Sequence, residues 1–131
     1  MPTTLPTPAR KLEAEATADL VAWAREVLGL TYRELAAYTG ATLRTAQRWG
    51  RAAAFTRPSA EHRPQLDALR ELRRLLGRTF GDGPDGTAAA AAWLYRAVPL
   101  LDGARPIDRV RAGDVDAVVA VLAGAYAGAF A

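Results

Sequence analysis

Residues 30–51 read LTYRELAAYTGATLRTAQRWGR and contain the capping and turn residues from which the fold can be predicted. Thr31 and Glu34 have the spacing of a capping box, so a helix is predicted to begin directly after Thr31. Gly40 provides the left-handed residue that ends such a helix, and Thr42 is suited to cap the next one. Two short helices joined by a glycine turn are typical of the helix-turn-helix motif.

Helical spacing divides the side chains of both short helices into an inward and an outward set. Leu35, Ala36 and Tyr38 of the first helix, and Ala46 and Trp49 of the second, are predicted to face inward. The outward side of the second helix is left with side chains that can pair with base edges or phosphates. Together with the cap, the predicted DNA-binding residues are Thr42, Arg44, Gln47, Arg48 and Arg51.

The charge along the chain favours a polyanionic partner for its N-terminal part. Residues 1–80 hold 13 basic and 8 acidic residues, a net charge of +5, whereas residues 81–131 hold 4 and 6, a net charge of −2. No acidic residue lies between positions 35 and 60, where four arginines do. A solvated basic face in an ordinary helical bundle is the alternative. The turn glycine, the inward pattern and the charge together favour DNA binding.

Composition excludes several kinds of site. The chain has no cysteine, which excludes disulfides, thiolate metal sites and cysteine nucleophiles. His62 is the single histidine and lies in a polar helix start, so we predict a surface residue. The aspartates lie at turns and helix starts, where capping explains them, and no nucleophile–base pair or metal-ligand spacing accompanies them. We therefore expect no enzyme, no metal and no cofactor. The lack of a signal-peptide pattern and of an apolar run of about 18 residues indicates a cytoplasmic protein without a membrane partner.

We expect an all-α protein in which an N-terminal helix-turn-helix bundle is followed by a small C-terminal helical domain. Residues 1–8 are rich in Pro and Thr and predict a disordered arm. Residues 9–80 form the predicted DNA-binding domain, residues 81–86 (GDGPDG) a linker, and residues 87–131 the C-terminal domain.

Apolar spacing predicts the remaining helices. The first, over residues 9–28, has an inward stripe of Leu12, Ala16, Leu20, Ala24, Val27 and Leu28, with Trp23 at its edge. A long helix is predicted from a cap at Ser59 to about Thr79. Three more are predicted over residues 87–97, 106–112 and 114–128, with a strand over 117–122 as the alternative within the last.

The C-terminal half carries a recognisable order of residues: Trp93-Leu94, Pro99, Leu101, Gly103, Pro106-Ile107-Asp108, a Val/Leu helix and Gly128. This order resembles the MbcA/ParS/Xre antitoxins, whose C-terminal domain binds a RES-domain toxin. The resemblance covers residues from about 80 to 131, and the preceding helix-turn-helix fits the usual arrangement of that family. Two positions depart from it: Ala97-Val98 replaces a frequent Pro-Asn pair, and Arg105 replaces a Ser or Thr cap.

The resemblance implies an antitoxin of a type II toxin–antitoxin system. Such a protein neutralises a RES-domain toxin that degrades NAD, and represses its own operon by binding operator DNA through the helix-turn-helix. In that family the extreme C-terminus reaches into the active-site cleft of the toxin, where a free carboxylate can occupy an anion pocket and an aromatic ring can stack. A frayed helix end is the alternative for this tail. The implied toxin-binding residues are Trp93, Pro99, Gly128, Ala129, Phe130 and Ala131.

Two further alternatives stay open. Trp93 has the helical spacing of a core residue, although tryptophan is also enriched at binding hot spots. A helix-turn-helix transcriptional regulator whose C-terminal domain binds a ligand or only dimerises is the second function. Whether the protein is an antitoxin or another helix-turn-helix regulator, we expect a homodimer that binds a two-fold repeat in DNA.

Overall fold

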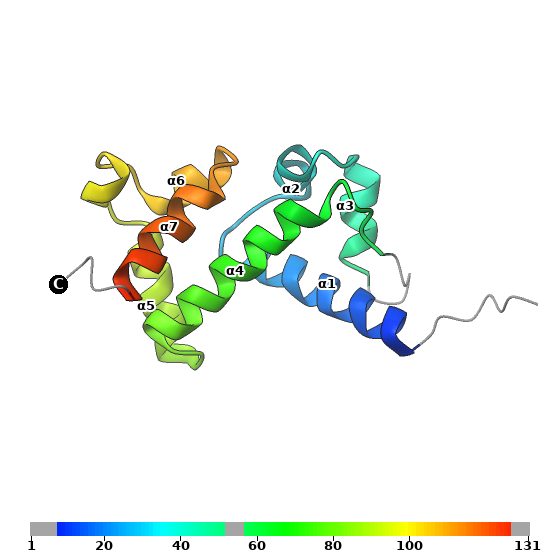
Figure 1. Ribbon diagram of the computed structural model, residues 1–131, viewed down its shortest axis with the longest axis horizontal. Coiled ribbons are helices and arrows are strands. Elements are labelled where there is room, and N and C mark those ends of the chain that lie inside the picture. Colours follow the sequence, from blue (N-terminus) through cyan, green and yellow to red (C-terminus); the bar gives the residue numbers. More distant parts are fainter. Residues whose placement is uncertain (1–7, 52–56, 127–131) are drawn as a thin grey trace, which may run out of the picture. The chain divides into compact units, whose positions relative to one another are not determined.

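The computed structural model describes residues 8–51 and 57–126, and every regular element in these ranges is a helix (Figure 1). The prediction of an all-α fold is thereby confirmed. In chain order the elements are α1 Pro8–Glu26, α2 Tyr32–Thr39, α3 Leu43–Trp49, α4 Arg63–Phe80, α5 Pro84–Leu94, the 3₁₀ turn η2 Pro99–Leu101, α6 Pro106–Arg111 and α7 Val115–Tyr126.

The helices divide into two compact units, Met1–Gln65 and Leu66–Ala131. This division lies inside α4 and not in residues 81–86, where the linker was predicted. Only the first part of the predicted linker is a turn, because Pro84 already begins α5. Gly86 is buried in the first turn of α5, and a Cβ there would collide with the backbone of Gly81. The glycines of this segment thus allow the chain to approach itself closely.

The helix-turn-helix is present as predicted. The Thr31 hydroxyl accepts the Glu34 amide at 3.0 Å, and the Glu34 carboxylate accepts the Thr31 amide at 3.0 Å, which completes a capping box. Gly40 ends α2 with φ +80°, a left-handed conformation that an L side chain adopts only at a cost. Thr42 caps α3 by accepting the Thr45 amide at 3.1 Å. These bonds lie within the motif itself, so a few residues determine where each helix begins and ends.

The buried face of α1 differs from the predicted stripe. Leu20 and Ala24 are buried as expected, but Leu12 is 64% exposed and Ala16 is also exposed. A strict four-residue spacing advances by about 40° around a helix at every step, so the stripe drifts away from the core toward the N-terminus. The buried positions alternate spacings of three and four instead: Ala14, Thr17, Val21 and Ala24.

The second unit buries leucines of α4 and, from α7, Val115, Val118 and Val121. The helical spacing of α4 places Leu66, Leu69, Leu72, Leu75 and Leu76 inside. The structure makes residues 117–122 part of α7, so the strand alternative was wrong and the three–four spacing outweighed the β propensity of valine. Two predicted boundaries were also shifted: α4 begins at Arg63 and not after Ser59, and α5 covers Pro84–Leu94 and not residues 87–97.

Within the part of the chain that the structure describes, no helix combines the length and apolar character needed to cross a bilayer.

Candidate functional site

The outward face of α3 collects the side chains predicted to bind DNA. Ala46 and Trp49 are buried, at 0% and 1% exposure, and turn the opposite side of this short helix to solvent. That side exposes Arg44, Gln47 and Arg48, and Arg51 is exposed just after the helix. Thr42 is exposed as well, but its hydroxyl is engaged in the cap and donates to the Thr45 hydroxyl at 3.0 Å. We therefore regard Thr42 as the residue that positions α3.

The arginines of this face differ from those of α4 in their partners. Among the described residues, Arg44, Arg48 and Arg51 form no ion pair. On α4, by contrast, Arg70 pairs with Asp67 at 2.8 Å and Arg74 with Glu71 at 2.6 Å. The Arg74 hydrogen bond lowers the pKa of the Glu71 carboxyl. The arginines of the α3 face are thus available to bind a partner, whereas Arg70 and Arg74 of α4 are already paired with neighbouring carboxylates.

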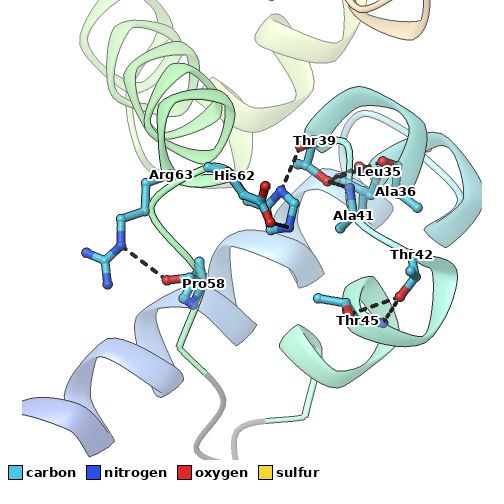
Figure 2. A network of polar contacts seen from close by, with 10 residues as sticks. Leu35, Ala36, Thr39, Ala41, Thr42, Thr45, Pro58, His62 and Arg63 are labelled. Atoms are coloured by element: carbon cyan, nitrogen blue, oxygen red, sulfur yellow. Dashed lines mark hydrogen bonds and ion pairs between the residues drawn. The ribbon is translucent and has the colours of Figure 1, made fainter.

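His62 is not the surface residue that its sequence context predicts. Its side chain is only 12% exposed, and Nδ1 lies 2.9 Å from the carbonyl oxygen of Thr39, at the C-terminal end of α2 (Figure 2). Its ring also meets the buried ring of Trp49 edge to face, with the centroids 5.6 Å apart. His62 therefore satisfies one of the carbonyls that a helix end leaves without an intrahelical partner, and supports the residue that anchors α3. His62 and Thr39 are 23 positions apart in the sequence, which explains why no local pattern indicated this role.

In the second unit, the structure brings the predicted residues Trp93 and Pro99 together. They line an open cleft of about 330 Å³ with Arg96, Ala97, Val98 and Leu100. Trp93 is 9% exposed and packs against Phe80, with ring centroids 6.0 Å apart, which agrees with the core alternative. Pro99 is exposed, and Leu100 is 61% exposed. The cleft is consequently a largely apolar surface, in which the exposed side chains of Pro99 and Leu100 lie near a core tryptophan.

The residues that follow the cleft in the sequence are held by an arginine, Arg109, that the sequence analysis did not identify. Arg109 of α6 donates to the carbonyl oxygen of Leu101 at 3.2 Å and lies 3.7 Å from Asp102 and 3.5 Å from Asp114. Asp102 adopts a positive φ of 57°, and Gly103 follows with φ 81°. These contacts tie the end of η2, directly after Pro99 and Leu100, to α6. An arginine in the last turn of a short helix gave no sequence signal for this task.

Arg105 explains how α6 begins without the hydroxyl cap expected there. Its guanidinium binds the Asp108 carboxylate through two hydrogen bonds, of 2.8 and 2.9 Å. The hydrogen bond lowers the pKa of Asp108 and raises that of Arg105, and the charge attraction between the two groups adds to both shifts. A bidentate pair across the first turn takes the place of a side-chain cap at this helix start.

The remaining predicted residues lie elsewhere. Gly128, Ala129, Phe130 and Ala131 fall outside the described residues. Residues 8–51 and 57–126 contain no group of three or more His, Cys, Asp or Glu side chains that could hold a metal ion.

The fold is similar to that of a chain in the crystal structure of the M. tuberculosis MbcT–MbcA toxin–antitoxin complex. The two chains are 29% identical, and their superposition has a TM-score of 0.51. The match covers 87% of this chain and 96% of that chain. The sequence matches no protein-family model and no curated protein. Along most of its length, the chain therefore shares an all-helical fold with a component of a toxin–antitoxin complex.

Proposed function

We propose that this protein is the antitoxin of a toxin–antitoxin pair. The observation that carries the proposal is the similarity to a chain of the MbcT–MbcA complex, because its coverage includes both compact units. The two chains are similar in sequence, at 29% identity, as well as in fold. This similarity agrees with the resemblance of residues 80–131 to RES-toxin antitoxins. We take the partner to be a RES-domain toxin that degrades NAD.

The N-terminal unit is proposed to repress the operon. A helix of seven residues whose outward side offers two arginines and a glutamine has the chemistry to read base edges in a major groove. The absence of acidic residues between positions 35 and 60 leaves this charge uncompensated along the sequence. A dimer that presents two copies of α3 would read a two-fold operator.

The C-terminal unit is proposed to hold the toxin. The cleft beside Trp93 and Pro99 supplies an apolar docking surface, and residues 128–131 supply the segment that plugs the toxin's active site. Phe130 is the large apolar side chain of that segment. The cleft is less suited to a small ligand, because its lining residues all come from positions 93–100 and Leu100 is largely exposed. Small-molecule sites usually enclose most of the ligand surface.

The test is co-expression with the product of the adjacent reading frame. The full chain should restore growth and the cellular NAD level in cells that express the toxin, and should co-purify with it. Deletion of residues 128–131 should abolish this protection and leave DNA binding intact.

An Arg44→Ala/Arg48→Ala variant is the matched control, since it should lose DNA binding and still protect. Full protection by the truncated chain would rule the plug out. Failure of the full chain to protect cells or to bind the neighbouring protein would overturn the antitoxin assignment itself.

A further inference from the structure

A second feature of the N-terminal unit borders the outward face of α3. An open cleft of about 560 Å³ lies between the α1–α2 turn and α3. Its lining includes Arg25, Thr31, Tyr32, Arg33, Leu43 and Gln47. Gln47 belongs both to this cleft and to the α3 face described above, so the two surfaces are continuous. A partner that lies along α3 therefore also covers the cleft.

Tyr32 holds one side of the cleft in place. A Cβ atom at Gly50, the residue that follows α3, would lie 2.5 Å from the Tyr32 hydroxyl, so the end of this side chain lies close against the chain directly after α3. The Arg25 guanidinium lies over the same ring, with Cζ 4.2 Å from the ring centroid. A guanidinium held over a ring by a cation–π contact still has N–H donors that can bind an anion. Arg25 is thus positioned at the cleft before any ligand arrives.

The charge of the cleft is positive. Neither Arg25 nor Arg33 forms an ion pair with a residue that the structure describes, and both are exposed. Glu34, which follows Arg33 in the sequence, does not line the cleft, and its carboxylate accepts the Thr31 amide in the capping box. Glu26 is the other acidic group close to Arg25 in sequence, and it is exposed. Two guanidinium groups and one amide side chain therefore face a space that is open to a phosphate-bearing ligand.

We propose that this cleft binds backbone phosphates of the DNA that α3 reads, and that Arg25 and Arg33 are the residues that contact these phosphates. This inference rests on the proposed DNA-binding function. In a helix-turn-helix complex the recognition helix occupies the major groove while the preceding helix crosses the sugar–phosphate backbone. Arg33 lies in the first turn of that preceding helix, and Arg25 in the last turn of α1. Phosphate contacts at these positions set the register of the duplex and carry no base information.

The test is the salt dependence of DNA binding by the full chain. Fluorescence anisotropy is measured on a duplex from the region upstream of the reading frame and on a scrambled duplex, between about 50 and 200 mM salt. Arg25→Ala/Arg33→Ala should lower the slope of log affinity against log salt by about 1 to 2, at about 0.9 per lost phosphate contact. The affinity for both duplexes should fall by a similar factor. Arg25→Lys/Arg33→Lys keeps the charge and should keep most of the slope.

Arg10→Ala/Lys11→Ala removes the same charge from the first turn of α1, outside the residues that line the cleft, and is the control, while far-UV circular dichroism checks that each variant folds. A slope unchanged in Arg25→Ala/Arg33→Ala, with wild-type binding intact, overturns this inference and leaves the proposed function standing. A wild-type chain that binds neither duplex at low salt overturns the DNA-binding part of the proposed function together with it. Titration of the DNA-free protein with ATP separates the two sources of phosphate. Saturable NMR shifts at Arg25 and Arg33, combined with an unchanged slope, would assign the cleft to a free nucleotide.

Discussion

His62→Ala should destabilise the protein far more than the polar surroundings of this histidine in the sequence suggest. The substitution removes the 2.9 Å contact with the Thr39 carbonyl oxygen and the edge-to-face contact with Trp49. A hydrogen bond contributes about 1 kcal/mol to stability, and an aromatic pair about 0.5–1.5 kcal/mol beyond the area that it buries. We expect the free energy of unfolding to fall by roughly 2 kcal/mol, with a small further loss from the cavity.

The assay is urea unfolding of the full chain, followed by circular dichroism and by Trp fluorescence. His62→Phe separates the two contributions, because it keeps a ring against Trp49 and removes the donor to Thr39. It should recover about half of the loss. Glu61→Ala is the control: it removes a contact of 3.5 Å to the His62 Nε2 from a side chain that is 78% exposed, and should cost less than about 0.5 kcal/mol. A His62→Ala midpoint that coincides with the wild type would refute the role of His62 in supporting α3.

Three further outcomes are expected. Gly40→Ala should cost about 1–2 kcal/mol, measured by thermal or urea unfolding, because its φ of +80° places a Cβ against the following carbonyl; a neutral result would contradict the left-handed cap. The pKa of Asp108 is lowered by the Arg105 hydrogen bond, so the stabilisation from this pair is complete above the ordinary carboxyl pKa and is lost as the pH falls through the lowered one. An NMR titration of the Asp108 carboxyl would show the lowered pKa, and Arg105→Ala should abolish this shift. In Asp108→Asn, the free energy of unfolding should depend less on pH in the acidic range where Asp108 titrates. Arg44→Ala and Arg48→Ala should each weaken operator binding by about 1–3 kcal/mol if each makes a bidentate base contact, and an unchanged gel shift would refute that assignment.

Where the governing interactions are local, the sequence alone predicted this protein well. The capping box of Thr31 and Glu34, the left-handed Gly40 and the Thr42 cap all act within a few residues along the chain. The burial of Ala46 and Trp49 follows from the period of the helix and leaves Arg44 and Arg48 outside. The all-α fold, the position of the motif and its basic face were therefore determined by short-range patterns.

Contacts between residues that are far apart in the sequence became visible only in the folded structure. Spacing along α1 could not show that Leu12 points away from the core, because the packing partners of a helix determine which face is buried. The contact of His62 with Thr39 and Trp49, and the cleft that joins Arg25 to Gln47 through Tyr32, both need chain segments that lie far apart in sequence. Hydrogen bonds and packing of this kind depend on where the folded helices come to lie, and that arrangement has no periodic signature in the amino-acid order.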